Sequence, residues 1–148
     1  MLATVKSGIR EVMVMKKRYY MVPAAMALLL LVCAGENKLP EGFDKNAVYK
    51  TARNFILNLN KKEYNCCYSL FNKKMQTAMD REKLQSTLDS VLASLGEFVR
   101  FKGISAAPKK ILGQDYTVCT VKCVYENGSA TYTLSLDRDL KIGGLYIK

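Results

Sequence analysis

The amino-acid sequence predicts an α+β domain in which three helices precede an antiparallel β-sheet of about four strands. Three observations indicate this order. Apolar residues recur at helical spacing through residues 44–95, and after Gly96 apolar and polar residues alternate, with many β-branched side chains. The dipeptide Asn127-Gly128 lies between two alternating runs, which is typical of a hairpin turn. We expect a single domain over residues 43–148, a length that commonly folds alone.

The first 34 residues differ from this domain and have the layout of a bacterial export signal. A basic segment at residues 16–18 precedes an apolar run over residues 21–32, and small and polar residues follow. The run is shorter than the roughly 20 residues that a membrane-spanning helix needs. Met15 is an alternative translation start, because residues 1–14 match no part of such a signal. We expect a leader over 1–34, a tether over 35–42, and a protein that works outside the cytoplasm.

Two processing routes overlap at the end of the leader. The small side chains before the bond that follows Ala34 are consistent with cleavage there. Lipidation of Cys33 is the other route, because residues 30–33 are similar to a lipobox, although Val32 stands where Gly, Ala or Ser is usual. In a third interpretation Cys33 is only an apolar residue of the leader. Lipidation would hold the domain at the outer face of the membrane, whereas cleavage would secrete it.

The predicted helices have apolar stripes and recognisable ends. Asp44 is a typical N-cap of the first helix, which ends at the polar turn 60–62. Asp80 and Gly96 are typical caps of the third helix. The stripes are Val48, Ala52, Phe55 and Leu59 in the first helix, Tyr64, Cys67, Tyr68, Phe71 and Met75 in the second, and Leu84, Leu88, Val91, Leu92 and Leu95 in the third.

The first predicted strand covers residues 97–107, and we expect Pro108 to end it. A two-residue turn of the primed type at Asn127-Gly128 would pair Glu126 with Ser129. A last strand over residues 141–148 follows a turn at 137–139. The hairpin would bury one apolar face against the helices, made of Cys119, Val121, Cys123, Tyr132, Leu134 and Leu136.

The residue content excludes several chemistries. The chain has no histidine, which removes Ser/His/Asp and Cys/His nucleophile systems and histidine-bearing zinc sites. The net charge is +10, and loss of the leader leaves 18 basic and 12 acidic residues, or +6. Basic doublets such as Lys73-Lys74 and Lys109-Lys110 lack the aromatic interleaving of a nucleic-acid surface. We therefore expect no nucleic acid as a partner. We expect the positive charge to attract anionic lipid headgroups or wall polymers.

Four cysteines remain after the leader: Cys66, Cys67, Cys119 and Cys123. Cys119 and Cys123 are four residues apart in one predicted strand, too far for a bridge between them. Buried free thiols and a single bridge from the adjacent pair to the sheet are both consistent with the sequence. The adjacent pair is poorly placed for a tetrahedral zinc site, so we expect no metal ion and no cofactor.

Four stretches resemble the DUF3887 domains of bacterial exported proteins and lipoproteins: LPEGFD (39–44), NLNKKEYNCCYSLFNKKM (58–75), ASLGEF (93–98) and KIGGLYI (141–147). The resemblance implies a fold of the NTF2-like, cystatin-like group, with helices on a curved antiparallel sheet, and it carries no catalytic motif. Leu140 stands where this family tends to have a turn glycine. A left-handed backbone there would cost roughly 1 kcal/mol.

The sequence favours a non-catalytic accessory or binding domain over an enzyme. A small pocket would be lined by Phe55, Tyr68, Tyr132 and Leu134, although the same spacing also fits plain core. An NTF2-like small-molecule enzyme is an alternative, but no paired carboxylate lies on the predicted inner face, and Asp115 is placed near solvent. An immunity or inhibitor-type protein that covers a partner is a further alternative. The expected partner is a protein or small ligand at the cell envelope.

Overall fold

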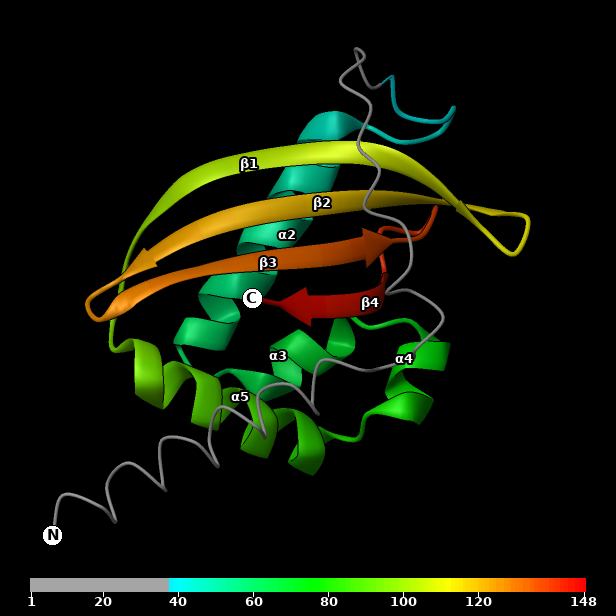
Figure 1. Cartoon of the computed structure of the whole chain (residues 1–148). Coiled ribbons are helices and arrows are strands. Elements are labelled where there is room, and N and C mark those ends of the chain that lie inside the picture. Colours follow the sequence, from blue (N-terminus) through cyan, green and yellow to red (C-terminus); the bar gives the residue numbers. More distant parts are fainter. Residues whose placement is uncertain (1–37) are drawn as a thin grey trace, which may run out of the picture. The chain divides into compact units, whose positions relative to one another are not determined.

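Helices cover one face of a curved antiparallel sheet in the computed structural model, which describes residues 38–148 (Figure 1). Cys33 and the predicted leader lie outside these residues. The helices are α2 (Lys45–Asn60), α3 (Tyr64–Ser69), α4 (Lys73–Ala78) and α5 (Arg81–Leu95). The strands are β1 (Phe98–Ile111), β2 (Gln114–Tyr125), β3 (Gly128–Leu136) and β4 (Ile142–Ile147). Within 38–148, no helix has the length and hydropathy to cross a membrane.

The first and last helices begin and end where the sequence predicts. The Asp44 carboxylate accepts bonds from the amides of Asn46 and Ala47 at 3.1 and 3.2 Å. The Asp80 carboxylate caps α5 by accepting from the Lys83 amide at 2.8 Å, and Gly96 ends this helix with a φ of +76°. The predicted stripe of α2 is completely buried. Local capping chemistry therefore sets these boundaries.

The sequence predicts one second helix with a single apolar stripe, and this prediction is wrong. The structure has two short helices there, α3 and α4. The chain leaves helical geometry between α3 and α4 because it joins the sheet there. Phe71 forms a parallel bridge to Ile142, the amide of Asn72 donates to the Ile142 carbonyl at 2.9 Å, and the Ile142 amide donates to the Leu70 carbonyl at 2.8 Å. Long-range backbone bonds to β4 replace helical ones at this point.

The sheet has the strand order β1-β2-β3-β4, and its inner face forms the core with the helices. Each apolar position that the sequence places on the inner face of the hairpin is buried: Cys119, Val121, Cys123, Tyr132, Leu134 and Leu136. The hydroxyls of Tyr125 and Tyr132 are 2.6 Å apart in this interior. Burial of paired polar groups costs little when they bond each other, so these tyrosines can lie in an apolar core.

The predicted hairpin register is wrong by two residues. Tyr125 pairs with Gly128, so the turn consists of Glu126 and Asn127, and neither has a positive φ. The amide of Asn127 donates to the Leu95 carbonyl at 2.9 Å, and the Glu126 amide donates to a carbonyl at the start of β1. The end of α5 therefore determines the turn. Side chains alternate with a period of two, so the shift leaves every face assignment unchanged.

Pro108 does not end the first strand, which is a second correction. β1 continues to Ile111, and Pro108 pairs with Thr117 of β2. β1 is an edge strand with one neighbour, so a residue without an N–H group is tolerated there. The β1–β2 turn consists of Leu112 and Gly113, with φ values of +49° and +78°. Two positive values are typical of a type I′ turn, which the sequence analysis placed at the other hairpin.

Candidate functional site

The β1–β2 and β3–β4 turns lie at the same end of the sheet as α4 (Figure 1). Residues of these segments line a cleft of about 520 Å³. Its wall consists of Asn72, Lys73 and Lys74 at the start of α4, Gly113 of the β1–β2 turn with Gln114, Asp115 and Tyr116 at the start of β2, and Asp137, Arg138 and Asp139 of the β3–β4 turn. Three segments that are distant in the sequence thus contribute charged side chains to one hollow.

Asn72 connects the helical side of the cleft to the β3–β4 turn. Its side-chain oxygen accepts from the amide of Met75 at 2.9 Å and caps α4. Its side-chain nitrogen donates to a carboxylate oxygen of Asp137 at 3.2 Å. Because both ends of the amide are engaged, Asn72 ties the start of α4 to the β3–β4 turn.

Gly143 permits this close packing. A Cβ atom at this position would lie 2.8 Å from the side-chain nitrogen of Asn72 and 3.2 Å from a ring carbon of Tyr116. These distances are shorter than van der Waals contact, so any side chain here would push the walls of the cleft apart.

The β3–β4 turn is held by Asp137. One oxygen of its carboxylate accepts from the amides of Asp139 and Lys141 at 3.0 and 2.9 Å. Leu140 in this turn has a φ of +57°, so the position that the family resemblance marks as a turn glycine is left-handed, as expected. The guanidinium of Arg138 donates to the Asp115 carboxylate at 2.7 Å, so a second carboxylate of the cleft is paired within the protein.

The lysines of the cleft differ from its aspartates. Neither Lys73 nor Lys74 has an ion pair or a side-chain hydrogen bond among the described residues, and both are exposed. The side chain of Asp139 is likewise unpaired there, whereas Asp115 and Asp137 are engaged. Asp137 accepts bonds only from neutral groups and keeps its negative charge, so the three basic and three acidic side chains of the cleft cancel in formal charge. The charged groups left without a partner are the ammonium groups of Lys73 and Lys74 and the carboxylate of Asp139.

None of the predicted pocket residues lines the cleft. Phe55, Tyr132 and Leu134 are completely buried between the layers, and the ring of Phe55 lies 5.8 Å from that of Phe71. Tyr68 is half-buried, and its hydroxyl donates to the Gln76 carbonyl at 3.2 Å. A pocket among these four residues stays a prediction, while the cleft lies in turns that carry no periodic pattern.

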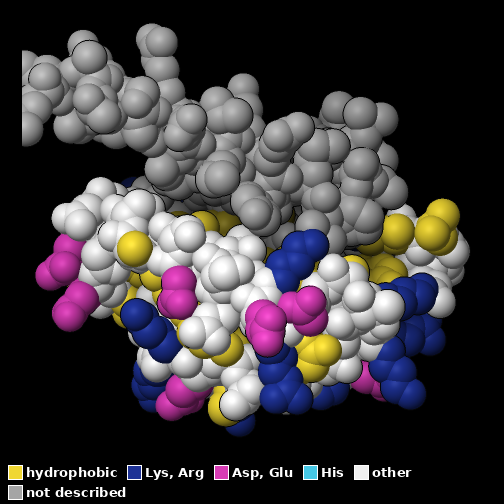
Figure 2. All heavy atoms as spheres, turned by 90° about the horizontal axis from the view of Figure 1, so that it is seen from below, with side chains coloured by type: hydrophobic (Ala, Val, Ile, Leu, Met, Phe, Trp, Pro, Cys, Tyr) yellow, Lys and Arg dark blue, Asp and Glu magenta, His cyan; other side chains and the backbone are white. Residues whose placement is uncertain are grey.

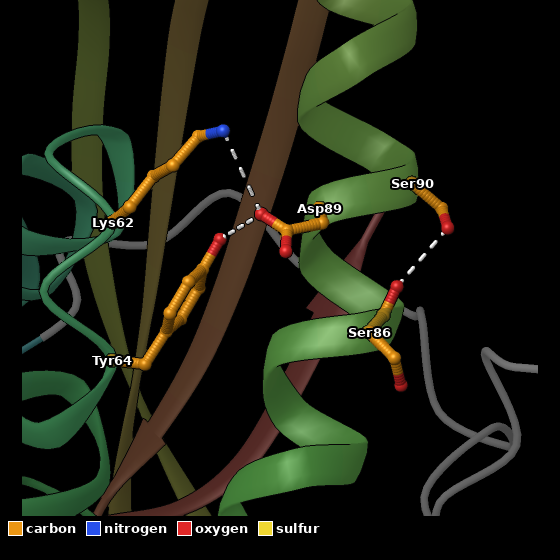
Figure 3. Close-up of polar contacts among 5 residues, drawn as sticks. All are labelled: Lys62, Tyr64, Ser86, Asp89 and Ser90. Atoms are coloured by element: carbon orange, nitrogen blue, oxygen red, sulfur yellow. Dashed lines mark hydrogen bonds and ion pairs between the residues drawn. The ribbon is translucent and has the colours of Figure 1, made fainter.

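A second polar cluster joins the α2–α3 turn to α5 (Figure 3). The hydroxyl of Tyr64 donates to the Asp89 carboxylate, and the ammonium of Lys62 lies 4.0 Å from the same oxygen. Ser90 donates to the Ser86 carbonyl one turn away at 3.0 Å. Burial, together with the bond to Asp89, raises the pKa of Tyr64, so its hydroxyl keeps its proton at neutral pH. The cluster therefore ties helices together and offers no base.

The four thiols that the structure describes are free. Cys67, Cys119 and Cys123 are buried, and desolvation raises the pKa of each to about 12. A thiol with this pKa is protonated at neutral pH and is a poor nucleophile. Cys66 is exposed. Among residues 38–148 no three acidic or cysteine side chains are grouped to hold a metal ion.

Comparison with protein-family models identifies the family of this chain. The model of DUF3887, described as a protein of unknown function, matches residues 52–145, which is more than half of the chain. The chain belongs to the DUF3887 family. A search of curated proteins finds no match. The NMR structure of a protein from Ruminococcus gnavus ATCC 29149 is similar to this DUF3887 domain, with a TM-score of 0.64 and 28% identity over 74% of this chain and 95% of that chain.

Proposed function

We propose that this DUF3887 protein is a non-catalytic binding domain that works outside the cytoplasm, and that its cleft binds an acidic ligand through Lys73 and Lys74. The observation that carries the proposal is that both lysines of the cleft are exposed and unpaired among the described residues, while Asp115 and Asp137 accept bonds within the protein. A carboxylate or phosphate group could bind both ammonium groups, and neither lysine would have to break an existing ion pair to bind it.

The chemistry of the described side chains supports binding over catalysis. The buried thiols are protonated at neutral pH, and the Tyr64 hydroxyl is a donor to Asp89. Two of the three carboxylates in the cleft, those of Asp115 and Asp137, are held by Arg138 and by backbone amides. A general base must be free to accept a proton from a substrate, which leaves only the exposed Asp139 in the cleft.

The location outside the cytoplasm is supported by the leader pattern, with its basic segment at 16–18 and its apolar run at 21–32. A protein or small ligand of the cell envelope is accordingly the expected partner. The charged side chains that Figure 2 shows over the helical side are of both signs and interspersed, which is typical of a solvated surface. The cleft is the better candidate for a binding site because it is hollowed and is lined by charged side chains from three segments of the chain.

Titration of ¹⁵N-labelled protein with inorganic phosphate and with a tetraglutamate peptide tests the proposal. We expect chemical-shift changes at residues 72–74, 113–116 and 137–139, and their loss in the double variant Lys73→Ser/Lys74→Ser. The matched control is Lys50→Ser/Lys83→Ser, which removes two exposed lysines outside the cleft and should bind as the wild type does. Equal changes at all surface lysines, or none at the cleft, would refute it.

A further inference from the structure

The tip of the β1–β2 hairpin has two unfavourable features at one residue. Leu112 is 97% exposed, and its backbone is left-handed with a φ of +49°. A two-residue turn of this kind normally has Asn or Asp before its glycine, because these side chains tolerate a positive φ. Leucine here stabilises neither the turn nor the core. The left-handed backbone costs energy that this exposed side chain does not offset by packing, so the stability of the isolated fold does not explain the leucine.

No other large apolar side chain of the described chain is so fully exposed. The next most exposed are Val99 at 56%, Tyr146 at 43% and Leu57 at 37%. Leu140 has nearly the same backbone conformation, with a φ of +57°, but its side chain is half-buried. The comparison separates the two turns, since only the β1–β2 tip presents its leucine entirely to the surroundings.

Two basic residues, Lys109 and Lys110, precede this tip on β1. On its other side Gly113 lines the cleft, which contains Lys73 and Lys74 as well as three aspartates. The nearest carboxylate on the paired strand, Asp115, is bonded to Arg138. Figure 2 shows hydrophobic and basic side chains together at the edge where the β1–β2 tip lies in Figure 1.

We propose that this tip, defined as Lys109–Gln114, docks on a lipid bilayer that contains anionic lipids, with Leu112 entering the boundary between headgroups and acyl chains. An apolar side chain flanked by lysines has the two chemistries of that boundary, since the lysines meet lipid phosphates and the leucine meets acyl chains. A single leucine gives only reversible association, so the leader or a lipid at Cys33 would supply the second signal for stable binding.

Docking of the tip goes beyond the proposed function, because the cleft can bind an acidic ligand whether or not Leu112 enters a membrane. The two proposals use different lysines, with Lys109 and Lys110 assigned to the bilayer and Lys73 and Lys74 to the ligand. An experiment can therefore refute membrane docking and leave ligand binding in the cleft intact, or the reverse.

The chain contains no tryptophan, so one introduced tryptophan reports on its own position even if the leader also binds lipid. We would add vesicles of phosphatidylcholine and phosphatidylglycerol to the full-length variant Leu112→Trp. The emission should shift to shorter wavelength and be quenched by brominated acyl chains. Val99→Trp is the matched control, because it lies near the other end of β1, roughly 40 Å along the strand.

The basic residues are tested by Lys109→Ser/Lys110→Ser in the Leu112→Trp background, where vesicle partition of the tip should fall about 30-fold if each lysine contributes as expected at an anionic surface. Vesicles of phosphatidylcholine alone should give a much smaller shift. Unchanged emission of Leu112→Trp, or an equal shift in Val99→Trp, would overturn the proposal. The tetraglutamate titration, repeated on Leu112→Trp without lipid, shows separately whether the cleft binds its ligand.

Discussion

Replacement of Leu112 by asparagine should stabilise the domain. A leucine in the left-handed region costs about 1–2 kcal/mol, whereas asparagine adopts this conformation readily. Leu112 is 97% exposed, so its removal loses almost no packing. We expect Leu112→Asn to raise the free energy of unfolding by about 1 kcal/mol, which corresponds to about 4 °C in melting temperature for a domain of this size.

Urea denaturation followed by far-UV circular dichroism measures the effect, with the slope against denaturant compared between variants to exclude a change in the unfolded state. Leu140→Asn is the matched control, because it relieves the same strain at a half-buried position and should gain less. An unchanged or lower midpoint for Leu112→Asn would refute the reasoning, since it would mean that Leu112 makes stabilising contacts. If the tip docks on a bilayer, this more stable variant should also bind anionic vesicles less well.

Three further predictions concern the cleft and the interior. Gly143→Ala should lower the free energy of unfolding by about 1–3 kcal/mol in urea denaturation, because its methyl group meets Asn72 at 2.8 Å, whereas Gly103→Ala, where nothing lies within 4 Å, should change it by less than about 0.5 kcal/mol. Equal effects would contradict the packing argument. Tyr64→Phe should destabilise the domain by about 1 kcal/mol through loss of its bond to the α5 carboxylate, and an unchanged urea midpoint would argue against that bond. Above pH 9, stability should fall as pH rises toward 12, because the unfolded thiols ionise while the three buried thiols stay protonated. The pKa of Tyr64 and of Tyr125 is also raised, so both tyrosines add to the decline above pH 10. Cys123→Val should make the decline shallower from pH 9 upward, and an identical slope would rule out that thiol as a cause.

Local chemistry explains which parts of the fold the sequence predicts well. Capping by Asp44 and Asp80 and the ending of α5 at Gly96 depend on residues within a few positions of each other, and each is confirmed. Alternation along β2 and β3 predicts the buried face in the same way, because it needs only the period of a strand.

The errors occur where distant segments decide the local structure. The helical stripe through Phe71 continues past the point where its backbone joins Ile142, and nothing near it in the sequence indicates this bridge. The hairpin turn shifts because the Asn127 amide bonds the Leu95 carbonyl at the end of α5. Pro108 is tolerated because β1 is an edge strand, which only the strand order reveals.

The cleft could not be predicted because its residues lie at the start of α4, at the β1–β2 connection and in the β3–β4 turn, with no common spacing. Two signals were present in the sequence. The doublet Lys73-Lys74 lacks the aromatic interleaving of a nucleic-acid surface, and Asp137-Arg138-Asp139 predicts only a turn between two strands. Only the tertiary structure shows that these two segments line one cleft. The side chain of Asn72 donates to Asp137, 65 positions away, and so joins the lysine doublet to the turn.

The proposed function is tested most directly by reversing the charge of the cleft. Dissociation constants of tetraglutamate and tetralysine peptides would be measured by isothermal titration calorimetry for the wild type and for Lys73→Glu/Lys74→Glu. We predict that the wild type prefers tetraglutamate and that the charge-reversed variant prefers tetralysine. Unchanged preference in the variant would contradict the claim that these two lysines make the cleft a site for acidic ligands.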